Sequence, residues 1–281
     1  MSLRINNNSG SAFSSYQLQK MQKTDQALSE SLTRLSTVKR INKASDDAAG
    51  MVIANELESQ AMGFGQAIQN VKDAASIAQV ADGVLGQATD IIQDIRVKAV
   101  QASSAAQSPE SRQAIQADIS KNLESLKSIA NSTSFNGQQL LSGTFTGKEF
   151  QVGTSSGEVA EISLGSIDPA MISDGSSGTL AGIDVTTSEG AQAAIEVSDA
   201  ALEHIGRQQS QVGSTQNQLE STIQNLSNSR ISTLASASEI EDLDYAEESI
   251  NLNRIKLLSQ AQAFAQTKAD TVAKHIVDVL G

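Results

Sequence analysis

The sequence contains no cysteine, no tryptophan and only two prolines, and aromatic residues make up 3% of it. Without cysteine the chain can form neither disulfides nor thiolate metal sites. Because aromatics are scarce, the apolar material is mostly Ala, Leu, Ile and Val, which suits narrow helical seams. Proline interrupts helices, so a chain of 281 residues with only Pro109 and Pro169 can hold very long ones.

Basic residues are also few. The chain has 20 Lys and Arg against 32 Asp and Glu, a net charge of −12. Nucleic acids and anionic membrane surfaces require clustered basic residues, so neither is expected as a partner. No stretch approaches the roughly 20 apolar residues of a membrane span. The first residues, MSLRINNNSG, lack the apolar region of a Sec-type signal peptide, so we expect any export to use another route.

The residue patterns of enzymes and metal sites are not found. His204 and His275 are isolated, without the ligand spacing of a metal site. The pairs Asp46-Asp47 and Glu247-Glu248 are placed in connectors, which favours solvated or interface charge over acid–base catalysis. The sequence has no phosphate loop, HExxH motif or nucleophile elbow. We expect a protein that is not an enzyme and uses no cofactor.

Apolar residues recur with a helical period over most of the chain. An unbroken seven-residue repeat over 57–99 predicts a coiled-coil-type rod of about 45 residues, roughly 70 Å long. Its members are Leu57, Phe64, Val71, Ala78, Leu85, Ile92 and Ala99. Further helices are predicted over about 12–38, from Ser108 to about 131, behind a capping box at Thr186–Glu189, and from about 250 to the C-terminus.

The middle of the chain differs, because ten of the 19 glycines lie between 137 and 190. Residues 148–152 and 159–164 are predicted to form a hairpin. Residues 40–50 and 235–249 break the apolar period and are predicted to be irregular connectors. The predicted fold is mainly α, with long coiled-coil-like helices and a small β region at about 138–185. We expect three segments: 1–44, 45–235 as the rod, and 236–281.

The two terminal helices carry apolar stripes that form too thin a pair to be stable alone. We therefore expect neighbouring copies to bury them, and we expect residues 1–38 and 250–281 to be disordered in the free monomer. The stripe residues are Leu28, Leu32, Leu35, Leu252, Ile255, Leu258, Val272, Ile276 and Val279.

Several segments resemble bacterial flagellin. They are MSLRINNN at the start, LTRLSTVKRINKASDDAAGMVIANELESQ at 32–60, NSTSFNGQQLLSG at 131–143 and EIEDLDYAEESINLNRIKLLSQAQAFAQ at 239–266. The resemblance implies a subunit of the hollow extracellular filament, exported through the flagellar type III channel. It implies as partners other copies of the chain, an export chaperone at the C-terminal helix, and the filament cap and hook-junction proteins. With about 50 residues between its helical halves, the chain is similar to a short flagellin without outer domains.

Two other functions fit parts of the sequence. The hook–filament junction protein is a homologous structural relative, although the close match at both ends and the short middle favour the filament subunit. A soluble coiled-coil module or a membrane translocator is compatible with uninterrupted heptads. The acidic charge and the specific terminal matches oppose that reading.

The first connector contains a cluster of basic residues in an acidic chain. We hypothesise that this cluster contacts acids of the second connector, within or between subunits; the alternative is a solvated connector. The charged residues concerned are Arg34, Lys39, Arg40, Lys43, Asp46, Asp47, Glu239, Glu241, Asp242 and Glu247.

The resemblance also implies an innate-receptor contact segment at Gln93–Gln101. Family members that activate the receptor carry an arginine where this chain has Asp94 and a leucine where it has Lys98. Arg96, Gln101 and Asp118 match ordinary members. Reversing a charge at the centre of a contact opposes binding, so we expect weak activation.

The glycine-rich middle is rich in Ser and Thr, which related flagellins modify with O-glycans. A simple solvated loop is the alternative. The candidate positions are Thr154, Ser155, Ser156, Ser173, Ser176, Ser177 and Thr179.

Overall fold

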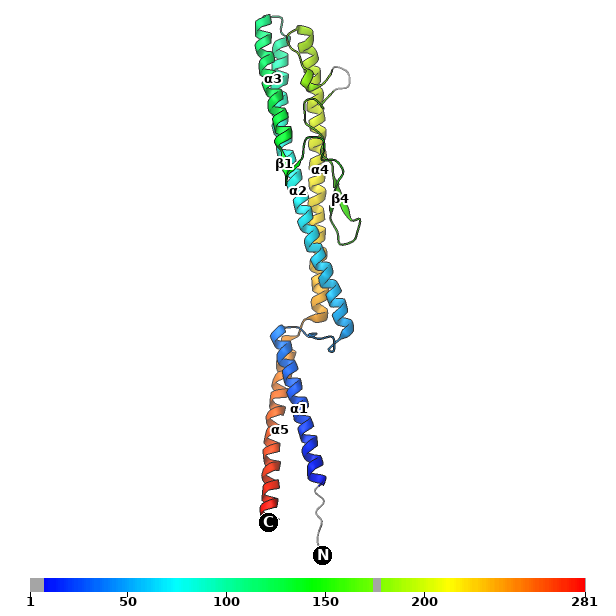
Figure 1. The fold of residues 1–281 in the computed structure, drawn as a ribbon, viewed down its shortest axis with the longest axis vertical. Helices are drawn as coiled ribbons and strands as arrows, with labels where there is room; N and C mark the ends of the chain where they lie inside the picture. Colours follow the sequence, from blue (N-terminus) through cyan, green and yellow to red (C-terminus); the bar gives the residue numbers. More distant parts are fainter. Residues whose placement is uncertain (1–7, 174–177, 281) are drawn as a thin grey trace. The chain divides into compact units, whose positions relative to one another are not determined.

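The computed structural model describes residues 8–173 and 178–280, and it describes side chains for 15–173, 178–272, 274 and 275 (Figure 1). The described chain is dominated by five long helices and carries two small antiparallel sheets, so the predicted fold class is confirmed. The helices are α1 (Asn8–Thr37), α2 (Ala48–Ser103), α3 (Pro109–Ser132), α4 (Ser188–Glu241) and α5 (Tyr245–Leu280). The short elements are β1 (Ser134–Phe135), β2 (Gln138–Gln139), β3 (Lys148–Gln151), β4 (Val159–Ile162) and the 3-10 turn η1 (Leu180–Gly182).

The chain divides into two compact units. The terminal unit comprises Met1–Ser59 and Ser232–Gly281, and within it α1 and α5 lie side by side (Figure 1). The central unit comprises Gln60–Ile231 and contains most of α2 and α4, all of α3, and both sheets.

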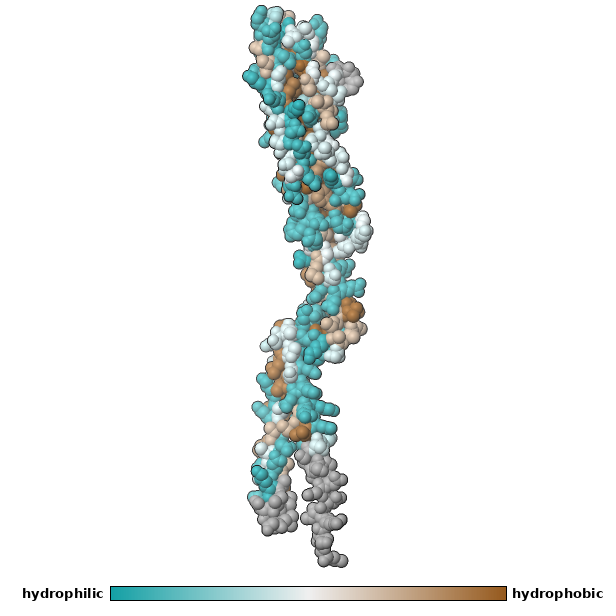
Figure 2. Space-filling model, viewed as in Figure 1, coloured by the Kyte–Doolittle hydropathy of each residue, from teal (hydrophilic) through white to brown (hydrophobic). Residues whose placement is uncertain are grey.

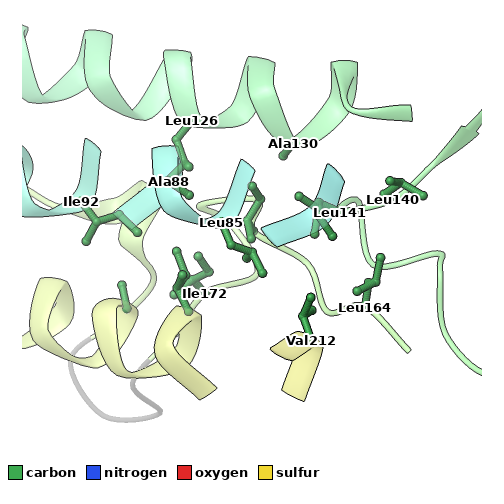
Figure 3. Close-up of a cluster of buried hydrophobic side chains, with 14 of the residues drawn as sticks. Leu85, Ala88, Ile92, Leu126, Ala130, Leu140, Leu141, Leu164, Ile172 and Val212 are labelled. Carbon is green, nitrogen blue, oxygen red and sulfur yellow. The ribbon is translucent and has the colours of Figure 1, made fainter. Parts of the chain in front are cut away.

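The seven-residue repeat of α2 forms the core of the central unit. The repeat members from Val71 to Ala99 are fully buried, whereas Phe64 is half-buried at the edge of the cluster. Leu126 and Ala130 of α3 approach this stripe from one side, and Val212 of α4 from another (Figure 3). Small Ala side chains in the stripe allow the helices to approach closely, so the core stays narrow.

Loop residues complete this core. Leu140, Leu141, Leu164 and Ile172 lie in irregular segments and are fully or almost fully buried among the helices (Figure 3). The described parts of the segment between α3 and α4 are therefore packed against the helices, and these buried side chains contribute to the stability of the unit.

Polar side chains fasten the irregular segments to the helices. Gln116 of α3 bridges two backbone groups: its Nε2 donates to the Ile183 carbonyl at 3.0 Å and its Oε1 accepts from the Val185 amide at 2.8 Å. The Asn70 amide of α2 donates to the Gln151 carbonyl at 3.0 Å and holds β3. These side-chain amides satisfy backbone groups that have no partner strand to pair with.

Three local predictions require correction. The segment 235–249 is not a connector: α4 continues to Glu241 and α5 begins at Tyr245, leaving only residues 242–244 outside the helices. Its small and acidic residues break the apolar period but do not prevent helix formation. The first connector is also shorter than predicted, at residues 38–47, because α2 already begins at Ala48.

The third correction concerns the start of α4. The cap is Thr187, whose Oγ1 accepts from the Gly190 amide at 3.0 Å, so the capping residue lies one position after the predicted Thr186. The β1–β2 hairpin was not predicted from the sequence. Its two-residue loop is Asn136-Gly137, and both residues have positive φ, as a type I′ turn requires.

The Gln116 bridge can be tested by substitution. Gln116→Ala removes two hydrogen bonds and leaves the amide of the buried Val185 without its partner, so we expect the free energy of unfolding to fall by roughly 1–3 kcal/mol. Urea unfolding followed by circular dichroism measures the change. Gln113→Ala, an exposed position on the same helix, is the matched control, and equal effects of the two substitutions would contradict the role of Gln116.

Candidate assembly surface

The contact between α1 and α5 has the spacing of a coiled coil but an unusually polar interior. Its buried positions in α1 include Thr24 and Ser31, seven residues apart, and in α5 the buried member is Glu248. The half-buried positions keep alternating steps of three and four residues, and we call the set the inner seam. The inner seam consists of Gln17, Met21, Thr24, Leu28, Ser31, Leu35, Glu248, Leu252, Ile255, Ser259, Gln262 and Gln266.

Two polar atoms of the inner seam are buried without a hydrogen-bond partner among the described residues, Ser31 Oγ and Gln262 Oε1. Burial of an unpaired polar group opposes the gain from the neighbouring apolar contacts. These two groups therefore lower the stability that the pairing of α1 with α5 would otherwise have.

Large apolar side chains also lie on the outside of the same helix pair. Ile250, Leu257 and Phe264 of α5 are 71%, 67% and 66% exposed, and they are spaced by seven residues. Leu18 and Leu32 of α1 are about half exposed. Figure 2 shows brown, apolar residues at the surface of this pair. Several large apolar side chains of the terminal unit are thus exposed in the single chain.

Some of the residues predicted for polymerisation lie in the inner seam, and others are exposed on the outside of the helix pair. Four of them, Leu28, Leu35, Leu252 and Ile255, are half-buried in the inner seam. Leu32, Leu258 and Val272 are exposed. The side chains of Ile276 and Val279 lie outside the described residues. Sequence reasoning missed the exposed row at 250, 257 and 264, although its seven-residue spacing is visible in the sequence.

The first connector folds through its own acids. Asp46 Oδ2 accepts from the amides of Asn42 and Lys43, each at 3.0 Å, and these contacts lower the pKa of Asp46, with a smaller contribution from the charges of Arg34 and Lys43. Asp47 caps α2 by accepting from the Gly50 amide at 2.9 Å. Both carboxylates of this pair therefore fix the local backbone by accepting hydrogen bonds from its amides.

The surroundings of position 50 favour glycine, because any larger residue would displace two neighbouring side chains. A Cβ there would lie 2.5 Å from Asp47 Oδ2 and 2.9 Å from the methyl end of Ile41, which is buried. The RINKASDDAAG motif is explained by this arrangement: Ile41 packs beneath the first turn of α2, and the two acids satisfy the exposed amides around it.

The structure brings one basic residue of the first connector to an acid of α4. Lys39 Nζ lies 2.7 Å from Glu241 Oε1 and 3.5 Å from Glu58 Oε1, and the hydrogen bond to Glu241 raises the pKa of Lys39 despite some desolvation. Arg40 contacts no carboxylate among the described residues; its guanidinium donates to the Ile240 carbonyl at 2.5 Å. That contact joins the same two segments without pairing charges.

The other predicted connector charges do not form ion pairs with one another in the part of the chain that is described. Arg34 and Lys43 lie near Asp46, and their positive charges help to lower the pKa of Asp46. Asp242 accepts a hydrogen bond from Ser238 at the end of α4, and Glu247 lies in the first turn of α5, where its amide donates to Asp244 Oδ1. Glu239 is exposed.

A strained residue joins α1 to the connector. Val38 has φ +58°, a left-handed conformation that costs roughly 1–2 kcal/mol for a residue with a Cβ, and more for a β-branched side chain. Its carbonyl accepts from the Leu243 amide at 3.1 Å, and the Arg40 amide donates to the Glu241 carbonyl at 2.6 Å. These backbone bonds between residues 38–40 and 241–243 hold the strained conformation, which no sequence pattern indicated.

The receptor segment lies on α2 and is tied to its neighbours. Lys98 pairs with Asp118 of α3 at 3.4 Å, and Asp94 accepts from Asn122 of α3 at 2.6 Å. Arg96 pairs with Asp199 of α4 at 2.5 Å. Both Gln93 and Gln101 are exposed. The two residues that depart from receptor-activating relatives thus contact α3.

The candidate glycosylation positions lie in different settings. Thr154, Ser155 and Ser156 are exposed in the loop between β3 and β4. The Ser173 hydroxyl donates to the Gly178 carbonyl at 3.1 Å, and Thr179 is half-buried. Both Ser176 and Ser177 lie outside the described residues.

Neither histidine belongs to a recognisable metal site in the described ranges, which contain no group of three or more candidate metal ligands. His204 is half-buried beside Gln208, with 3.3 Å between its Nδ1 and Gln208 Nε2, and desolvation lowers its pKa, helped by the charge of Arg207. Within the described residues, no helix combines the length and apolar character needed to cross a membrane.

Comparison with known proteins gives a consistent result. A model of the bacterial flagellin N-terminal helical region matches residues 5–146, and a model of the C-terminal helical region matches 195–280. Flagellin from Halalkalibacterium halodurans is 34% identical over 251 residues, which cover 89% of this chain and 91% of that relative. Flagellin B from Helicobacter pylori is 49% identical over 144 residues, or 51% of this chain. The chain spans only 27% of that relative's length.

A solved structure with a similar fold is described as a putative flagellar hook-associated protein from Vibrio parahaemolyticus. It superimposes with a TM-score of 0.61 over 70% of this chain and 100% of its own length, at 14% sequence identity. This likeness concerns the fold alone.

The Lys39–Glu241 contact predicts a specific pattern of charge-reversal rescue. We expect Lys39→Glu to destabilise the terminal unit and the double variant Lys39→Glu/Glu241→Lys to recover the loss, with a coupling energy of roughly 0.2–1 kcal/mol because Lys39 is well exposed. Thermal unfolding of single and double variants measures it. Arg40→Glu should not be rescued by Glu241→Lys, since Arg40 binds a carbonyl; rescue there would refute the assignment.

The lowered pKa of Asp46 predicts that the conformation of the first connector depends on pH. Because its pKa is below the unfolded value of about 3.9, the ionised form stabilises the connector above that pH, and the contribution is lost as the pH falls through the folded pKa. The amide resonances of Asn42 and Lys43 should therefore shift together in acid. Asp46→Asn should abolish the shift, and Glu56→Gln should not; a shift that persists in the Asp46→Asn variant would disprove the contact.

Proposed function

Since the chain belongs to the bacterial flagellin family, we propose that it is a structural subunit of the flagellar filament and polymerises with copies of itself. The observation that carries this proposal is the exposed apolar row Ile250, Leu257 and Phe264 on α5, which α1 of the same chain leaves uncovered. A soluble monomer gains nothing from large exposed apolar residues at heptad spacing, whereas a polymer buries them.

The weak inner seam supports the same proposal. Its buried polar side chains contribute little to holding α1 and α5 together, so most of the stabilisation of these helices has to come from other chains. We propose that residues 1–38 and 250–281 are poorly ordered in the free monomer and become fixed on assembly. The central unit, with its extensive buried core, supplies the stable part of the monomer.

The proposed location is the extracellular filament, reached through the flagellar type III export channel. An export chaperone that binds α5 would cover the same exposed apolar row before assembly. The filament cap and the hook-junction proteins are the other proposed partners. No catalytic role is proposed for any residue.

The hook–filament junction protein is the alternative within the same group of structural proteins. The likeness to a hook-associated protein does not favour it, because at 14% identity it reflects the shared helical fold. The flagellin relative from Halalkalibacterium halodurans matches nearly its full length, which supports the filament subunit.

Electron microscopy of concentrated, purified chain tests the proposal. We expect filaments from the wild-type chain and none from Leu257→Gln/Phe264→Gln, which removes two exposed apolar side chains and should leave the central unit folded. Gln260→Ala, an exposed change on the same helix, should polymerise like the wild type. Monodisperse wild-type monomer under conditions that polymerise other flagellins would count against the proposal.

We also propose that the monomer activates the innate flagellin receptor weakly, because Asp94 and Lys98 replace residues that activating relatives use. The double variant Asp94→Arg/Lys98→Leu should increase the response of reporter cells at least tenfold, equivalent to about 1.4 kcal/mol of binding. Asp90→Arg is the matched control on the same helix. Potent activation by the wild-type monomer, or an equal gain from the control, would refute this prediction.

A further inference from the structure

The exposed residues of α5 form a second face with its own coiled-coil spacing. Successive steps of four and three residues connect Ile250, Arg254, Leu257, Ala261, Phe264 and Lys268, all of them exposed, and we call this set the outer α5 face. At about 100° per residue the set lies roughly 200° around the helix from the inner seam. The outer α5 face therefore points away from the α1 of its own chain.

Helix α1 carries a matching exposed row. Steps of four and three residues connect Leu18, Gln22, Asp25, Ser29 and Leu32, and we call this set the lateral α1 face. It lies roughly 100° around α1 from the inner seam, so it is also directed away from the α5 of its own chain. From Leu18 to Leu32 and from Ile250 to Phe264 both rows extend over two heptads, roughly 21 Å along a helix.

The charges in the two rows are complementary. The middle of the lateral α1 face is Asp25, and the apolar residues of the outer α5 face alternate with Arg254 and Lys268. Neither Asp25 nor Arg254 forms an ion pair within the described part of the chain, and Lys268 lies 5.6 Å above the Phe264 ring without an acidic partner there. Each row thus presents charge of the sign opposite to that of the other row.

The same charges argue against pairing of like faces. Two outer α5 faces in contact would place Arg254 and Lys268 of one copy against the same cations of the other. Two lateral α1 faces would oppose Asp25 with Asp25. Like charges opposite one another in a helical seam are unfavourable, so α1-to-α5 pairing is preferred.

We propose that the outer α5 face of one copy binds the lateral α1 face of a second copy. This inference rests on the proposed filament function and adds the pair of surfaces that meet. The contact joins different faces of the two copies, so it leaves one free face at each end of every oligomer and repeats into a ring or a helix. The inner seam fixes the angle between successive contacts, because it sets the separation of the two faces within each chain.

The absence of cysteine makes a cross-linking experiment clean. Single-cysteine full-length chains carry Leu32→Cys on α1 or one of Ile250→Cys, Leu257→Cys and Phe264→Cys on α5. Each is copolymerised as a minor component with wild-type chain, alone or as an α1–α5 mixture, and then oxidised mildly. We expect disulfide dimers only from α1–α5 mixtures, with at least one of the three α5 positions reacting at more than five times the control yield.

The controls are Lys23→Cys and Lys256→Cys, which are exposed on other sides of the same helices. Dimers from α5 variants alone, or equal yields from the controls, would overturn the inference, as would filaments without any α1–α5 dimer. Failure of the wild-type chain to polymerise would overturn the proposed function and this contact with it. Because each variant is a minor component among wild-type chains, it can be incorporated and cross-linked even where it cannot polymerise alone.

Charge reversal provides a second readout in the full chain. Asp25→Lys should lower the yield of filaments at least tenfold, and the triple variant Asp25→Lys/Arg254→Asp/Lys268→Asp should recover most of it. Lys23→Asp, a charge reversal on the other side of α1, should have a smaller effect. No recovery in the triple variant, while it still folds by circular dichroism, would overturn the pairing of these charges.

Discussion

The unbroken heptad row of α2 is the contact on which the central unit depends. Every repeat member from Val71 to Ala99 is buried, and α3, α4 and the loops between them all pack on that one stripe. With few aromatics, the chain obtains its buried area from length, since each added heptad contributes another layer of small side chains. The Gln116 bridge and the Asn70 contact then attach irregular backbone to this helical frame.

The terminal unit uses the same repeat with polar and apolar side chains mixed on both faces. Its inner seam buries Thr24, Ser31 and Glu248, whereas Ile250, Leu257 and Phe264 face outward. Buried polar residues at seam positions favour one register of the helix pair and lower its stability. The central unit holds the extensive buried core, and the terminal unit carries the surfaces that we propose for association.

Sequence periodicity predicted the long helices, the β3–β4 hairpin and the heptad core, because these depend on spacing alone. It failed at 235–249, where Ser238 and Asp242 interrupt the apolar pattern although the backbone remains helical to Glu241. The left-handed Val38 was also unpredictable, since bonds to residues 241–243 impose it from the other end of the chain. The charge pattern pointed to the connector, yet only the structure distinguishes Lys39, which binds a carboxylate, from Arg40, which binds a carbonyl.

The strain at Val38 and the polarity of the inner seam act on the same pair of helices. Both lower the stability of the terminal unit in an isolated chain, and neither improves a contact within it. A stable terminal unit would compete with assembly, because surfaces already satisfied within one chain gain less from a neighbour. In the proposed assembly, a second copy gains burial energy by covering the outer faces, which the pairing of α1 with α5 leaves exposed.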